Sequence, residues 1–143
     1  MNAITNYIKR INWRLLAADF ISGVLLLVFL YTAWSKLRES EQFTYTLSQS
    51  QLLSPFANVI AWLLPLSELV LVILLFIPAG RRIGLLASSL LLVALTLYLT
   101  YMVLYDPDLP CSCGGVLAEL TWKQHIFFNL FLLLLSIVGL RIY

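Results

Sequence analysis

Four apolar stretches, each long enough to cross a lipid bilayer, constrain this 143-residue chain more than any other feature. They cover approximately residues 15–37, 56–78, 83–105 and 122–142. A spanning helix needs roughly 20 mostly apolar residues, and inside lipid a backbone can satisfy its hydrogen bonds only within a helix or a closed barrel. We therefore predict an all-α, integral membrane four-helix bundle that forms a single domain over residues 1–143.

The overall composition supports this prediction and excludes several other classes. Hydrophobic residues make up 62% of the chain and charged residues 11%, against about 45–50% and about 25% in soluble domains. A small soluble domain leaves too much of its surface in water to hide so many apolar side chains. The net charge of +2 is too small to attract a polyanion, so we expect no nucleic-acid partner. The expected surroundings are the lipid bilayer.

The segment before the first stretch, residues 4–15, has apolar side chains at three- and four-residue spacing and polar ones mostly on the other side. This pattern predicts a short N-terminal interfacial helix, with Trp13 at the depth of the lipid headgroups. A cleaved signal peptide is the competing interpretation. Because the basic region is long and no small-residue cleavage site follows it, we expect no cleavage.

The basic residues predict the orientation of the chain. One set of flanking segments holds Lys9, Arg10, Arg14, Arg81, Arg82 and Arg141, and the other set holds Lys36, Arg38 and Lys123. Cytoplasmic flanks carry an excess of Lys and Arg. We therefore predict a multi-pass protein of the bacterial inner membrane with both termini in the cytoplasm and with loops 38–55 and 106–121 facing the periplasm. Asp19 is expected near the cytoplasmic interface, with Arg14 within reach.

The two cysteines of the chain, Cys111 and Cys113, lie in the second periplasmic loop. A disulfide between residues two apart closes almost no chain, so it would stabilise the fold poorly. Strained disulfides are also the more easily reduced ones, and the periplasm is oxidising. These points favour a redox-active pair. A structural disulfide, inert thiols and a metal site stay open, although two thiolates and one histidine fall short of a four-ligand zinc site.

Groups that follow the cysteines would tune their chemistry. Lys123, His125 and the N-terminus of the last helix, which Thr121 can cap, would lower the pKa of a nearby thiol from its ordinary value of about 8.5. A lone histidine is more often a structural group than a catalytic one, so both roles stay open for His125. The candidate catalytic residues are Cys111, Cys113, Lys123 and His125.

Polar residues within the apolar stretches suggest a site inside the bundle. Thiols alone would need pairs at more than one depth to carry electrons across a bilayer, so the onward acceptor must be another protein or a non-thiol cofactor, for which a membrane quinone is the favoured candidate. Glu68 lies about 18 Å along the second helix, near mid-bilayer, where a carboxylate normally points into the bundle. Its carboxyl group would form a hydrogen bond to a bound headgroup, relay a proton, or form a hydrogen bond to a neighbouring helix. Lys36 would either snorkel to lipid phosphates or pair with another group. Lys36 and Glu68 are the candidate cofactor-site residues.

Three short motifs carry a resemblance to a known family. They are AWSKL at residues 33–37, LPLSE at residues 64–68 and CSCGG at residues 111–115. Together they resemble the MauE branch of the DoxX-like membrane proteins, over most of the chain from about Leu15 onward. The Cys-x-Cys-Gly motif distinguishes the MauE branch from DoxX proteins at large.

This resemblance implies a four-helix inner-membrane bundle that forms or handles disulfides while an exported partner matures, as MauE is linked to the cysteine-rich small subunit of methylamine dehydrogenase. Gly115 stands where an aromatic residue is expected in the methylamine operon proteins, which favours a different client. We expect a thiol–disulfide redox protein whose partner is an exported cysteine-containing or thioredoxin-like protein. The chief alternative is a non-catalytic accessory or scaffold subunit of a membrane complex, in which the cysteines would be dispensable. A permeation role for Glu68 is weaker, and homo- or hetero-oligomerisation stays open.

Overall fold

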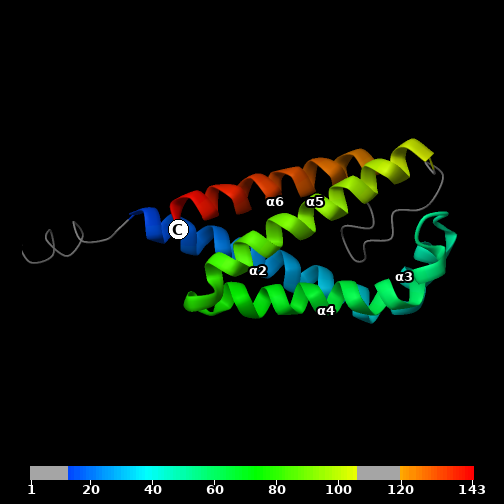
Figure 1. Cartoon of the computed structure of the whole chain (residues 1–143), viewed down its shortest axis with the longest axis horizontal. Coiled ribbons are helices and arrows are strands. Elements are labelled where there is room, and N and C mark those ends of the chain that lie inside the picture. Colours follow the sequence, from blue (N-terminus) through cyan, green and yellow to red (C-terminus); the bar gives the residue numbers. More distant parts are fainter. Residues whose placement is uncertain (1–12, 106–119) are drawn as a thin grey trace, which may run out of the picture.

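A computed structural model of the chain describes residues 13–105 and 120–143. The interfacial helix expected before Trp13, together with Cys111 and Cys113, lies outside these residues. The helices are α2 (Trp13–Arg38), α3 (Ser40–Gln49), α4 (Ala57–Phe76), α5 (Arg81–Tyr105) and α6 (Trp122–Ile142), with 3₁₀ turns η1 (Ser54–Phe56) and η2 (Pro78–Gly80) (Figure 1). Four of them, α2, α4, α5 and α6, are long and apolar enough to cross a membrane. The predicted all-α fold is confirmed.

The four spanning helices begin and end within two residues of the stretches expected from hydropathy. The segment 38–55, which the sequence analysis treats as a loop, instead contains α3 and η1. Phe43 and Leu47 of α3 are buried against Ala57 and Ala61 of α4. Because α3 has few apolar residues, hydropathy does not reveal it, and packing against α4 accounts for its stability.

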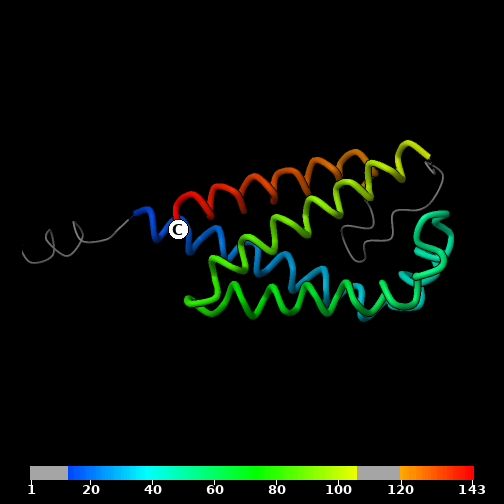
Figure 2. Tube along the Cα trace, in the orientation of Figure 1, coloured from blue at the N-terminus to red at the C-terminus, as the bar shows by residue number. Residues whose placement is uncertain are grey.

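The bundle has two distinct ends (Figure 2). At the η2 end, the start of α2 and the end of α6 lie near the turn that joins α4 to α5. At the α3 end lie α3, the start of α4 and the end of α5. Near the η2 end α4 and α5 approach closely, since a Cβ added at Gly84 would lie 3.1 Å from the backbone nitrogen of Leu75. A larger side chain at position 84 would therefore push these two helices apart.

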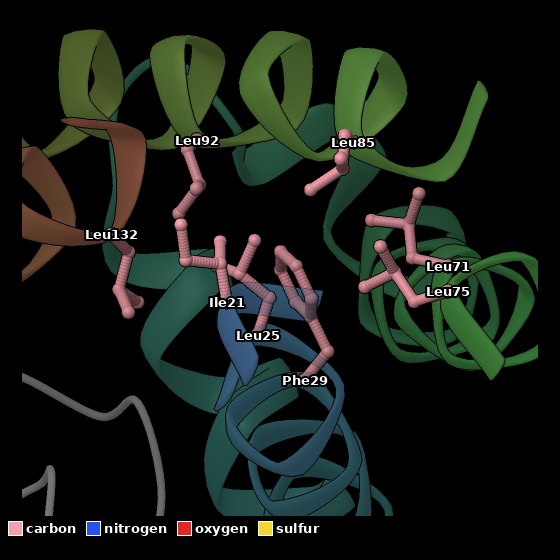
Figure 3. Close-up of a cluster of buried hydrophobic side chains, with 8 residues drawn as sticks. All are labelled: Ile21, Leu25, Phe29, Leu71, Leu75, Leu85, Leu92 and Leu132. Carbon is pink, nitrogen blue, oxygen red and sulfur yellow. The ribbon is translucent and has the colours of Figure 1, made fainter. Parts of the chain in front are cut away.

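One cluster of buried apolar side chains joins all four spanning helices (Figure 3). Its members are Ile21, Leu25 and Phe29 of α2, Leu71 and Leu75 of α4, Leu85 and Leu92 of α5, and Leu132 of α6. Lipid tails are as apolar as leucine, so membrane helices associate through close packing and hydrogen bonds rather than through the hydrophobic effect. The contact between α5 and α6 shows both, because Ser136 Oγ donates a 2.8 Å hydrogen bond to the Leu85 carbonyl and lies 2.9 Å from Ser89 Oγ.

A polar cluster around Arg81 fastens the η2 end. Arg81 Nη1 donates hydrogen bonds to the Asp19 carboxylate and, over 3.2 Å, to the Tyr143 hydroxyl. Its Nε donates to the Leu75 carbonyl over 3.1 Å, and the guanidinium carbon lies 5.9 Å from the centre of the Tyr143 ring. Arg81 therefore links α2, α4 and the C-terminal residue after α6, a partnership for Asp19 that the sequence analysis does not name.

We expect Arg81→Ala to lower the free energy of unfolding by about 1.5–3 kcal/mol, because it removes several hydrogen bonds from a charged group. Asp19→Asn should cost less than about 1 kcal/mol, since half-exposed ion pairs contribute little. The control is Arg82→Ala, which removes the same charge from an exposed neighbour. Denaturant titration in detergent micelles measures all three, and an equal loss for Arg81→Ala and Arg82→Ala would contradict the role given to Arg81.

Candidate functional site

A cavity of about 600 Å³ lies between the helices in the half of the bundle nearer the α3 end. Its wall comes from the second half of α2, from α3 and the two leucines before η1, from residues 60–68 of α4, from residues 91–101 of α5 and from residues 125–132 of α6. Most lining side chains are apolar, and the polar ones are Thr32, Lys36, Glu68, Tyr98, Tyr101, His125 and Asn129. A largely apolar cavity of this size with a few polar groups is typical of small-molecule sites.

An ion pair between Lys36 and Glu68 crosses from α2 to α4 at the cavity wall. Lys36 Nζ donates a 2.6 Å hydrogen bond to Glu68 Oε1, and the two side chains are 7% and 2% exposed. Lys36 belongs to the last turn of α2, yet its ammonium turns inward to the carboxylate instead of outward to lipid phosphates. Of the two arrangements expected for Lys36, the structure shows pairing.

Two buried polar atoms of the cavity have no hydrogen-bond partner among the described residues. They are Glu68 Oε2, the carboxylate oxygen that Lys36 does not bind, and Asn129 Nδ2 on α6. Asn129 is 5% exposed and Glu68 is 1% exposed. An unsatisfied buried polar group costs about 1–3 kcal/mol. Among the described residues the cavity wall thus holds one acceptor and one donor without a hydrogen bond, and the Thr32 side chain also lies beside the Glu68 carboxyl group.

His125 and Lys123 both lie at the start of α6, but one is buried and the other is exposed. The capping box expected there is present, since Gln124 N donates to Thr121 Oγ1 over 3.4 Å and Thr121 N donates to Gln124 Oε1 over 3.0 Å. His125 is buried and lines the cavity, whereas Lys123 is exposed. The structure therefore brings His125 to the same cavity as Lys36 and Glu68 and leaves Lys123 on the surface.

Asn129 and Thr32 also line the cavity, and neither is among the site residues predicted from the sequence. A signal for both is present in the sequence, because Asn129 follows His125 by four residues and Thr32 precedes Lys36 by four. Side chains four residues apart lie on the same face of a helix. Polar pairs at this spacing within otherwise apolar helices mark the faces of α2 and α6 that line the cavity.

Comparison with known proteins identifies the family. The family model described as Methylamine utilisation protein MauE matches residues 13–142. No curated protein and no solved structure matches the chain. The matched residues include all four spanning helices, α3 and the Lys36–Glu68 pair. Since the match covers nearly the whole chain, this multi-pass membrane protein belongs to the MauE family.

Proposed function

We propose that this protein is a thiol–disulfide redox protein of the bacterial inner membrane, which helps an exported partner to form disulfides through Cys111 and Cys113. Membership of the MauE family supports a maturation role, since the family is tied to methylamine utilisation and to the maturation of methylamine dehydrogenase. Gly115 favours another client for this chain. The single observation that carries the proposal is a largely apolar cavity with a few polar groups, in the half of the bundle nearer the end of α5, after which the chain continues to the cysteines.

Chain connectivity supports this arrangement. Cys111 lies six residues after α5 ends at Tyr105, and Cys113 lies nine residues before α6 begins at Trp122. Six residues of extended chain reach at most about 20 Å. Chain length therefore keeps Cys111 within about 20 Å of the end of α5, in the half of the bundle where Tyr101 of α5 and His125 of α6 line the cavity.

The proposed chemistry is an exchange of bonds between sulfur atoms. A thiolate of the partner attacks the Cys111–Cys113 disulfide and forms a mixed disulfide, and the partner's second thiolate then displaces the bound cysteine. The partner loses two electrons and two protons and gains a disulfide, while Cys111 and Cys113 become thiols. Since the chain has only these two cysteines, its pair must be reoxidised by another protein or by a non-thiol cofactor, and we propose a membrane quinone.

The basic residues of the structure support a periplasmic position for the cysteines. Because Lys36 is buried in an ion pair, it no longer counts as a flanking charge of the α3 end, which leaves Arg38 and Lys123 there. The described residues near the η2 end include Arg14, Arg81, Arg82 and Arg141. An excess of Lys and Arg marks the cytoplasmic side, and these four residues against two favour the η2 end as the cytoplasmic one.

Trapping of a mixed disulfide tests the proposal. In Cys111→Ser or Cys113→Ser the second step is blocked, so at least one of these variants should remain covalently bound to an exported protein. The bound species is detected on a non-reducing gel, identified by mass spectrometry and released by dithiothreitol. The double variant Cys111→Ser/Cys113→Ser is the control and should capture nothing. If neither single variant captures a partner, and exported proteins keep their disulfides in the double variant, the redox role is wrong and an accessory subunit is favoured.

A further inference from the structure

The cavity shares part of its wall with the outer surface of the bundle. Ala94 and Leu97 of α5 line it and are nevertheless exposed, Leu97 to 67%. Both residues lie in the interior of a helix long and apolar enough to span the membrane. An opening beside these residues would meet acyl chains rather than water, so we take the ligand to be a molecule that dissolves in the bilayer.

The polar atoms of the cavity limit the chemistry of such a molecule. Asn129 Nδ2 is a donor without an acceptor, and Glu68 Oε2 is an acceptor without a donor. Lys36 does not fill either need, because its ammonium binds the other carboxylate oxygen. A fitting ligand therefore carries a group that accepts a hydrogen bond from Asn129 and a group that donates one to Glu68, attached to an apolar body.

A membrane quinol meets these requirements, and the matching quinone meets only one of them. Each ring oxygen of either form accepts a hydrogen bond, as Asn129 requires. Only the reduced form carries O–H groups, and these can donate a hydrogen bond to Glu68 Oε2. The remaining wall, with Phe29, Leu64 and Phe128 among its apolar residues, suits a ring and the first part of an isoprenoid tail.

We infer that Asn129 and Glu68 form a quinone site that binds the reduced form more tightly than the oxidised form. The inference rests on the proposed function, for which it assigns the residues that bind the electron acceptor and the form that they bind more tightly. Oxidation of Cys111 and Cys113 breaks two S–H bonds, forms one S–S bond and releases two electrons and two protons. These reduce one quinone to one quinol by forming two O–H bonds, so the step balances. Tighter binding of the product makes the bound quinone a stronger oxidant, which drives electrons away from the thiols.

Direct binding measurements test this inference. The probes are decylubiquinone and decylubiquinol, titrated anaerobically into the purified protein in lipid nanodiscs, with quenching of tryptophan fluorescence as the readout. The background is Cys111→Ser/Cys113→Ser, so that no electrons are exchanged during the titration. We expect saturable binding of both forms, with the quinol about tenfold tighter, as one additional hydrogen bond to a charged group provides.

Two variants separate hydrogen bonding from general packing. Asn129→Leu should weaken both forms about tenfold or more, whereas Asn58→Leu, the control at an exposed position of α4, should leave both unchanged. Glu68→Gln places an amide donor where the acceptor was, so it should weaken the quinol and not the quinone. Lack of saturable binding would overturn the inference. Equal affinities with and without Asn129→Leu in the Cys111→Ser/Cys113→Ser background would also overturn it. Binding without mixed-disulfide capture would instead leave the site standing and refute the proposed function.

Discussion

Lys36→Met is expected to lower the free energy of unfolding by about 3–5 kcal/mol, the loss usual when one member of a buried ion pair is removed. The substitution leaves the Glu68 carboxylate 1% exposed and with no cation among the described residues. Glu68 lies eleven residues from the start of α4 and eight from its end. A side chain as short as glutamate cannot reach the headgroups from there, so the structure must open, or the carboxylate must take up a proton or remain buried without a cation.

The opposite substitution, Glu68→Met, should cost less. Lys36 is two residues from the end of α2, and lysine side chains near helix ends can reach the interface by turning outward. The double variant Lys36→Met/Glu68→Met should be more stable than Lys36→Met alone, because an apolar pair of similar volume replaces a buried ion pair at little or no cost. The order of stability is the specific result expected from this geometry.

Denaturant titration of the purified variants in mixed micelles, followed by circular dichroism, gives these free energies. The matched control is Arg38→Met, which removes a positive charge from the same turn of α2 at a position outside the cavity. If Arg38→Met loses as much stability as Lys36→Met, or if the double variant is the least stable of all, the ion pair does not stabilise the fold in the way described.

The spanning helices were predictable because the bilayer requires each spanning segment to be helical and apolar by itself, so hydropathy along the sequence reveals it. The packing of α3 was not, since its polar composition conceals Phe43 and Leu47, which become buried only when α4 is beside them. Short helices of this kind depend on tertiary contacts rather than on their own propensity. Local sequence therefore reveals the membrane-crossing part of the fold and not the element that closes one end of it.

The candidate site was predictable in its members more than in its connections. A carboxylate near mid-bilayer predicts a partner, but Lys36 is 32 residues away from Glu68. Their contact depends on the rotation and relative height of α2 and α4, which hydropathy does not determine. Asn129 was missed for a related reason. An amide within an apolar helix points to a binding site only once the same cavity is known to hold a carboxylate oxygen without a hydrogen bond. Cys111 and Cys113 lie outside the described residues, so their role rests on sequence and on the proposal.

Cysteine labelling from outside the cell should give an all-or-none difference between the two ends of the bundle. In the background Cys111→Ser/Cys113→Ser, a single cysteine is placed at either of two exposed positions, Ser54→Cys in η1 or Ala79→Cys in η2. If the α3 end faces the periplasm, a membrane-impermeant maleimide should label Ser54→Cys in intact cells with an opened outer membrane. Ala79→Cys should be labelled only after the inner membrane is permeabilised.

The same reagent applied to the unsubstituted protein then locates the native cysteines. After mild reduction, Cys111 and Cys113 should be labelled under the conditions that label Ser54→Cys, because the segment that carries them leaves α5 at the α3 end. Prior oxidation should protect them by forming the disulfide, and it should leave Ser54→Cys reactive. Labelling of Ala79→Cys but not of Ser54→Cys in intact cells would invert the orientation. The cysteines would then lie on the reducing side of the membrane, where a pair that forms disulfides in an exported partner has no substrate.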